Sequence, residues 1–324
     1  MFKRVSSSVK KHLSLAMLAL LAGSTLSACQ SNSMNPNYRM LPAQAQMQRA
    51  LPHSGVNVSL FSLNSSQRRP KLGLRLTPNR RRVRVAPEDM MPLDPRKPQG
   101  LPARVDLRQW ASPIDNQGEL GSCTGFSIKA ARELMLNRDG KPAFAPLSPL
   151  FIYYYERKQE GTIDEDAGAM ITTGMEVLKK IGVSREDLWS YDERNDNNPV
   201  TKEKFQLPPS REAYADARKY RVGQIRPLET LREIRYELAR RNPVVFGIEV
   251  YEAFYDTQNG RLPKPNPNEE SQGGHAVVAV GYDDREKMLI VKNSWGGDWG
   301  DQGYFYLPYD YVKFGLASEA WSAQ

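Results

Sequence analysis

The spacing of apolar residues changes at about residue 243 of this 324-residue chain. Before that point, apolar positions recur at helical spacing, which is the sign of a helix with one buried face. The pattern predicts helices at residues 122–137, 148–157, 170–181 and 228–241. Beyond it, short apolar runs bounded by Gly, Pro or Asp predict strands at residues 244–250, 276–282, 288–292 and 304–307. Helices followed by strands predict an α+β domain of two lobes.

The sequence before this domain has a different character. We expect the domain to span residues 101–324, because residues 29–100 are rich in Gln, Asn, Ser, Pro and Arg and show no sustained helical period. Such a composition is typical of a disordered linker, and we interpret it as a solvated tether. Two apolar stretches, residues 58–63 and 72–76, could instead dock on the domain or form a strand.

The net charge of +8 is distributed unevenly along the chain. Residues 29–100 contain 12 Lys and Arg against 3 Asp and Glu, whereas residues 101–324 contain 29 against 34. The basic character therefore belongs to the linker, and the folded part is mildly acidic. No nucleic-acid partner is expected from this distribution. Contact of the basic linker with anionic lipid or a cell-wall polymer is a second interpretation of its charge.

Residues 1–28 have the layout of a secretory signal peptide. Basic residues precede an apolar run at residues 13–21 that is too short for a permanent membrane span. The signal ends in Leu26-Ser27-Ala28-Cys29, which resembles the bacterial lipoprotein box, in which the cysteine becomes the lipidated first residue. The resemblance implies a lipid-anchored protein of the bacterial cell envelope, and Gln30 in place of an aspartate implies the outer membrane. The alternative is an ordinary signal peptide with a chance cysteine.

The predicted domain contains one cysteine, Cys123, and one histidine, His275. A thiol becomes a good nucleophile when a neighbouring imidazole takes its proton and a helix N-terminus stabilises the thiolate. Asn293 could hydrogen-bond the far ring nitrogen of His275 and fix its tautomer. Gln117, six residues before the cysteine, could donate to the oxyanion of an acyl transfer. One His and one Cys form no zinc-type ligand set, and neither a metal nor an organic cofactor is expected.

The candidate residues lie within a series of short motifs. In chain order these are Asn116-Gln117-Gly118, Gly121-Ser122-Cys123, Gly274-His275-Ala276, Lys292-Asn293-Ser294-Trp295-Gly296 and Trp299-Gly300. In content and order, across nearly all of residues 101–310, they resemble the motifs of the papain and cathepsin family of cysteine peptidases. The resemblance implies a papain-like two-lobed fold, with a helical lobe at residues 101–223, a strand-rich lobe at residues 224–324, and a cleft between Cys123 and His275.

The resemblance also implies a function, that of a cysteine endopeptidase acting on polypeptides through an acyl-enzyme intermediate. Cys123 would be the nucleophile, His275 the general base and then acid, Asn293 its orienter and Gln117 the oxyanion donor. Trp295 would shield the hydrogen bond between His275 and Asn293 from water.

The sequence departs from the family pattern in three places. Thr124 replaces a bulky aromatic residue after the nucleophile, which would remove bulk and open the site to water. Leu120 replaces a cysteine that usually forms a disulfide. The linker lacks the family's usual inhibitory pro-segment pattern, which favours direct activity over activation by cleavage.

Residues 164–166, all acidic, are interpreted as a solvated loop.

Two other functions remain open from the sequence. The first is a catalytically silent peptide-binding scaffold of the same fold. Its supporting feature is Thr124 in place of the bulky aromatic residue. The second is amidase or transpeptidase action on cell-wall peptides by the same residues, for which the basic linker is the supporting feature.

Overall fold

The computed structural model describes residues 69–79, 82–85, 100–143, 145–193, 203–255, 257–266 and 268–324. The predicted signal peptide, Cys29 and the apolar stretch at residues 58–63 lie outside the described residues. Among the described helices, none has the length and hydrophobicity needed to cross a membrane.

The helices that lie before residue 243 agree closely with the apolar spacing. They are α1 (Cys123–Arg138), α2 (Pro149–Glu160), α3 (Ile171–Lys180), α4 (Arg211–Ala217) and α5 (Leu231–Ala239). Helix α2 begins where the sequence predicts it, because the Ser148 hydroxyl accepts a hydrogen bond from Phe151 N at 3.1 Å and Pro149 occupies the first turn. Helix α4 was not predicted.

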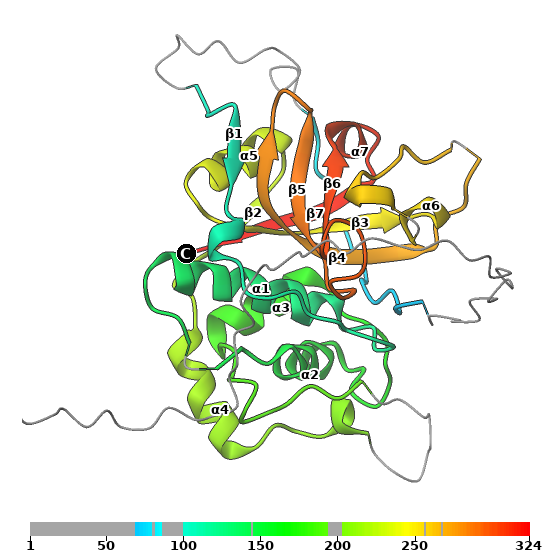
Figure 1. The fold of residues 1–324 in the computed structure, drawn as a ribbon. Coiled ribbons are helices and arrows are strands. Elements are labelled where there is room, and N and C mark those ends of the chain that lie inside the picture. Colours follow the sequence, from blue (N-terminus) through cyan, green and yellow to red (C-terminus); the bar gives the residue numbers. More distant parts are fainter. Residues whose placement is uncertain are drawn as a thin grey trace, which may run out of the picture. The chain divides into compact units, whose positions relative to one another are not determined.

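Helix α1 is the central element of the helical part. It packs against strand β4 (Gly273–Asp283) on one side and α2 on the other (Figure 1). Thirteen of its 16 residues are buried, so it contacts protein all round rather than along one face. Because protein surrounds the helix on all sides, its first residue, Cys123, lies inside the structure.

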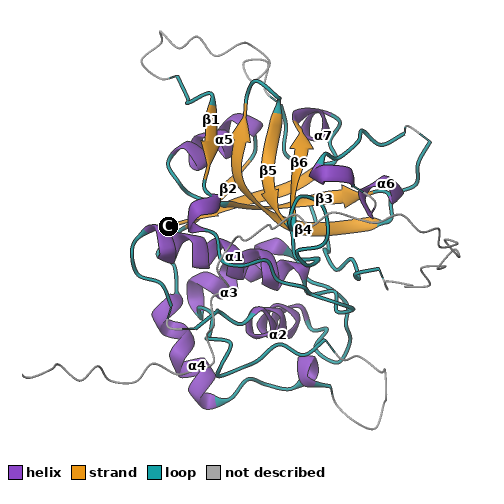
Figure 2. Ribbon diagram, viewed as in Figure 1, coloured by secondary structure: helices purple, strands orange, loops and turns teal. Residues whose placement is uncertain are grey.

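The described strands form one antiparallel sheet. Its order is β2 (Ile225–Leu228), β7 (Ala317–Ala323), β3 (Val244–Val250), β4, β5 (Met288–Lys292) and β6 (Tyr304–Pro308), and Figure 2 shows the helices beside it. Two short helices, α6 (Glu252–Tyr255) and α7 (Tyr309–Lys313), lie in the connections. Helices and an antiparallel sheet confirm the predicted α+β class. Strand β7 was missed because its sequence, ASEAWSA, has small and polar residues at buried positions.

The first strand corrects the predicted division into lobes. Strand β1 (Arg104–Asp106) pairs with β4, with Val105 opposite Tyr282. Residues 104–106 therefore belong to the sheet, although we expected residues 101–223 to form the helical lobe. Backbone pairing decides where this strand lies, and a three-residue strand gives no periodic signal.

Part of the predicted linker also packs on the domain. Leu74 is paired by its backbone with Ala169 on one side and Gly274 on the other. Val83 is buried, and Arg84 pairs with Thr230. For the described residues the solvated tether is therefore wrong, and the alternative that residues 72–76 dock on the domain is confirmed.

Candidate active site

Cys123 lies at the first turn of α1, fully buried and facing strand β4. Its Sγ accepts a hydrogen bond from the backbone N–H of Ala276 at 3.4 Å. The neighbouring residue in β4 is His275, which is also fully buried. The helix N-terminus and the strand thus bring the thiol and the imidazole to the same place from positions 152 residues apart in the sequence.

The His275 ring is held by one polar side chain and several aromatic ones. Its Nε2 is 2.8 Å from Oδ1 of Asn293, which directly follows β5. The Trp295 ring lies 4.8 Å from the imidazole and the Phe254 ring 6.4 Å, measured between centroids. The other ring nitrogen, Nδ1, is buried without a hydrogen-bond partner in the described part of the chain. Nδ1 is therefore available to exchange a proton with a thiol.

The amide of Gln117 is fixed at both ends. Its Oε1 accepts a hydrogen bond from the Ser294 hydroxyl at 2.7 Å, so its Nε2 is directed toward the cleft. Nε2 donates to the backbone oxygens of Leu120 and Lys71, both at 3.0 Å. Ser294 was not predicted as a site residue, although it stands directly after Asn293.

Residues 71–75 of the former linker, which we name the cleft segment, cover this site. The Leu74 N–H donates to Gly274 O at 3.1 Å, and the Gly73 carbonyl accepts from Ala169 N at 2.8 Å. The backbone of Gly73 also acts on the Cys123 sulfur and lowers the pKa of its thiol. The approach is so close that a Cβ on Gly73 would lie 1.8 Å from Gly121 O. Only glycine fits at this position.

The cleft segment occupies the site without presenting a bond for cleavage. A substrate of a cysteine peptidase would place one carbonyl with its carbon at the sulfur and its oxygen on the predicted oxyanion donor, Gln117. Here the carbonyl oxygen that accepts a hydrogen bond from Gln117 Nε2 belongs to Lys71. The backbone that acts on the Cys123 sulfur belongs to Gly73, two residues later. No single carbonyl serves both groups, and the described state is a closed one.

Burial sets the charge state of the closed site. It raises the pKa of the Cys123 thiol to about 11, against smaller lowering effects from backbone N–H groups. It lowers the pKa of His275 to about 4, against the raising effect of the hydrogen bond with Asn293. Both groups are therefore neutral near pH 7, and the thiol is not activated while the cleft segment covers it.

Thr124 does not open the site, contrary to the expectation from its small size. It is fully buried, and its hydroxyl donates to Oε2 of Glu156 at 2.7 Å. Burial raises the pKa of Glu156 to about 8. The space beside Cys123 is thus filled by a polar pair between α1 and α2. Periodicity could not reveal Glu156, because it lies within a helix that is largely buried.

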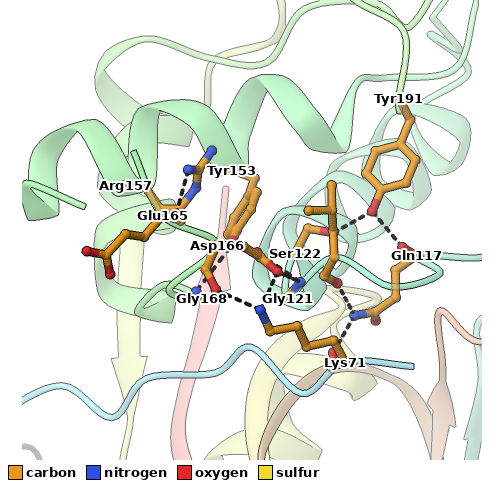
Figure 3. A network of polar contacts seen from close by, with 11 residues as sticks. Lys71, Gln117, Gly121, Ser122, Tyr153, Arg157, Glu165, Asp166, Gly168 and Tyr191 are labelled. Atoms are coloured by element: carbon orange, nitrogen blue, oxygen red, sulfur yellow. Dashed lines mark hydrogen bonds and ion pairs between the residues drawn. The ribbon is translucent and has the colours of Figure 1, made fainter. Parts of the chain in front are cut away.

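The acidic loop at residues 164–166 is only partly solvated. The side chain of Asp166 is 2% exposed and accepts hydrogen bonds from Gly121 N (Figure 3). The interpretation of a solvated loop is wrong for this residue.

An open groove remains on the side of Trp295. It has a volume of about 830 Å³ and is lined by Asn116, Gly118, Tyr255, Trp295 and Trp299, among others. Arg69, just before the cleft segment, lies over the Tyr255 ring at 4.7 Å at its border. A peptide chain could continue from the covered site along this groove. No group of three or more His, Cys, Asp or Glu suited to a metal occurs within the described ranges.

The match to known families decides the class of this protein. A family model described as "Papain family cysteine protease" matches residues 101–324. The chain belongs to this family. It is 41% identical over 234 residues to an uncharacterized peptidase C1-like protein of Acanthamoeba polyphaga mimivirus, covering 68% of this chain and 72% of the relative. It is 32% identical to cathepsin K of Gallus gallus, over 64% of this chain and 58% of that one.

Solved structures agree with this membership. Xylellain, a cysteine protease from Xylella fastidiosa, has a TM-score of 0.66 and 33% identity, over 79% of this chain and 97% of its own. The Carica candamarcensis cysteine protease CMS1MS2, solved in complex with E-64, shares the fold at 23% identity and a TM-score of 0.51, over 69% and 99%. The papain-like fold and the class of cysteine peptidase, a hydrolase, are thus established.

Proposed function

We propose that this protein is an endopeptidase that cuts polypeptides through an acyl-enzyme on Cys123. The observation that carries the proposal is the fixed arrangement of His275, with Nε2 on Asn293 and Nδ1 unpartnered, next to the buried thiol. Gln117 supports it, since the bond from Ser294 directs its Nε2 to where the oxyanion would form.

The residues would act in two half-reactions. The Cys123 thiol passes its proton to Nδ1 of His275, and the thiolate attacks the peptide carbonyl carbon. The oxyanion is stabilised by Nε2 of Gln117 and the backbone N–H of Cys123. Collapse breaks the C–N bond, and the imidazolium gives its proton to the leaving amine. Water, deprotonated by His275, then hydrolyses the thioester and restores the thiol. Trp295 protects the hydrogen bond between His275 and Asn293 from water.

We infer that activity requires the cleft segment to leave. The expectation of direct activity does not fit a site in which Gly73 and Lys71 occupy the nucleophile and the oxyanion donor. Displacement of the segment, or its cleavage, would let water and substrate in. The thiol and imidazole would then regain pKa values that allow an ion pair.

The location of the enzyme is a separate proposal. We propose that Cys29 carries a lipid and anchors the protein to the cell envelope, in the outer membrane, with the basic linker near anionic lipid or cell wall. Incorporation of a radiolabelled fatty acid in bacteria, lost in Cys29→Ser, tests the anchor. The papain-family relationship does not favour the silent scaffold or the amidase and transpeptidase alternatives.

The test of activity uses the full chain carrying Gly73→Ala, whose Cβ cannot fit beside Gly121. This variant should cleave a mixed peptide library at internal bonds, and additional Cys123→Ala or His275→Ala should abolish cleavage. Leu76→Ala is the control, because Leu76 is 52% exposed in the same part of the chain. If the folded Gly73→Ala protein cleaves nothing while its thiol reacts freely, the proposal is wrong.

A further inference from the structure

Lys71 of the cleft segment forms an ion pair inside the site. Its Nζ lies 2.6 Å from Oδ2 of Asp166 and donates to the Asp166 carbonyl oxygen at 3.0 Å. The carboxylate is 2% exposed, whereas the lysine side chain is 46% exposed. A buried carboxylate thus binds a cation that a half-exposed side chain carries, and Figure 3 shows the two groups pointing toward each other.

Asp166 is held in place by groups of the catalytic domain itself. Gly121 N donates to Oδ1 and Oδ2 at 3.1 and 3.2 Å, and the Tyr153 hydroxyl donates to Oδ1. Burial raises the pKa of Tyr153 well above its usual value, so this phenol remains a neutral donor. Tyr153 in turn accepts a hydrogen bond from Gly168 N at 3.1 Å. These contacts do not depend on the cleft segment.

The nearby arginine has another task. Arg157 donates to the carbonyl oxygens of Ile163 and Glu165 at 3.0 and 2.9 Å, and its guanidinium lies 4.2 Å from the Tyr153 ring centroid. It shapes the loop that carries Asp166. The charge of Arg157 also acts on Asp166 through space, but the cation that hydrogen-bonds the carboxylate is the Lys71 ammonium of the cleft segment.

Lys71 contacts two functional positions at once. Its carbonyl oxygen accepts from Nε2 of Gln117, the proposed oxyanion donor, while its ammonium reaches Asp166. A lysine side chain is therefore long enough to span from a carbonyl at that donor to the carboxylate. Gly121 also ties Asp166 to the chain two residues before the nucleophile.

We propose that Asp166 is a specificity-determining residue that binds a lysine or arginine side chain on the residue supplying the scissile carbonyl. This inference rests on the proposed peptidase function and names its substrate class. A basic side chain forms a charge-assisted hydrogen bond with the carboxylate, whereas a neutral one leaves a buried charge without its partner. Sites built to pair a polar group discriminate strongly against ligands that lack it.

The experiment compares two peptides that differ only in the residue before the cleaved bond, lysine or its uncharged analogue norleucine. In the full chain with Gly73→Ala, kcat/KM should favour lysine by about 10- to 100-fold. Adding Asp166→Asn should bring the ratio near one, by lowering kcat/KM for the lysine peptide and raising it for the norleucine peptide, because the buried charge is gone while asparagine still accepts from Gly121 N. Glu165→Gln is the matched control, since this neighbouring carboxylate is exposed and should leave the ratio intact.

A second readout separates this inference from the function on which it rests. Peptidyl chloromethyl ketones ending in lysine or norleucine label the thiol without needing turnover. Faster labelling by the lysine reagent, dependent on Asp166, supports the subsite even without peptide cleavage, in which case the endopeptidase proposal alone is wrong. In the Gly73→Ala chain that keeps Asp166, equal cleavage of both peptides and equal labelling by both reagents would overturn the proposed subsite. The proposed peptidase function would not be affected.

Discussion

The two walls of the site are built from different kinds of contact. The His275 wall is aromatic, and among the described residues the imidazole ring has one side-chain hydrogen-bond partner, Asn293. The Cys123 wall is a set of buried polar pairs: Ser122 with Tyr191, Thr124 with Glu156, and Gly121 with Asp166. On the first wall, apolar rings surround the imidazole that we propose as the base. The second wall carries the proposed nucleophile, Cys123, and the proposed binding residue, Asp166. The difference predicts large activity losses on the first wall and graded effects on the second.

The largest effect should come from the His275 wall. With Gly73→Ala present, Asn293→Ala should lower kcat/KM by about 100-fold or more, because the imidazole loses the partner that fixes its tautomer. Steady-state cleavage of a lysine peptide measures this. The control is Asn137→Ala, which removes a hydrogen bond to Trp110 O elsewhere and should leave kcat/KM within about twofold. A similar loss in both variants would mean that Asn293 acts only through stability.

On the Cys123 wall, removal of one hydroxyl should cost stability. Thr124→Val keeps the side-chain shape but leaves Glu156 without its donor, and the free energy of unfolding should fall by about 1–3 kcal/mol. Urea unfolding measures the change. Ser127→Ala, whose hydroxyl bonds to the Cys123 carbonyl within the same helix, should cost less. If Thr124→Val is as stable as the parent, the hydrogen bond between Thr124 and Glu156 does not stabilise the fold.

The same pair makes stability depend on pH. Since the pKa of Glu156 is raised to about 8 in the folded state from an ordinary 4.5, the folded state holds its proton more tightly. Its contribution is fully present below about pH 4.5 and is lost as pH rises through about 8. Glu156→Gln has no such proton, so its unfolding free energy relative to the parent should increase from pH 5 to pH 8. An unchanged difference would show that Glu156 ionises normally.

The smallest effect concerns the hold of the cleft segment. Lys71→Met in the otherwise unaltered chain should raise the rate of Cys123 alkylation by about three- to tenfold, because the buried Asp166 loses its cation. Arg69→Met should change it less than about twofold, since Arg69 pairs with an exposed carboxylate, Glu252. Equal effects of the two substitutions would mean that burial of Asp166 does not strengthen the contact.

The difference between the two walls also explains which parts of the site could be predicted from the sequence. His275, Asn293 and Trp295 lie within one short stretch, and the strands that carry them have clear apolar runs, so this wall could be predicted. On the other wall, Thr124 and Glu156 are 32 residues apart, Gly121 and Asp166 are 45, and Ser122 and Tyr191 are 69. Nothing local identifies such partners, because tertiary packing alone brings them together.

The position of the cleft segment in the site could not be predicted from the sequence for a related reason. Its composition resembles a linker, and its position depends on backbone pairing and on the absence of a side chain at Gly73 rather than on a helical or strand period. The apolar stretch at residues 72–76 indicated docking but not where.

We infer that the cleft segment covers a Cys123 thiol that becomes reactive once the segment leaves. The most direct measurement is the rate of Cys123 alkylation by iodoacetamide between pH 5 and 10, in the unaltered chain and in Gly73→Ala. We expect slow alkylation of the unaltered chain, rising only toward the thiol pKa of about 11. For Gly73→Ala we expect alkylation about 100-fold faster at pH 7, with an apparent pKa below that of an ordinary thiol. Matching rates and pH profiles in the two proteins would contradict the account.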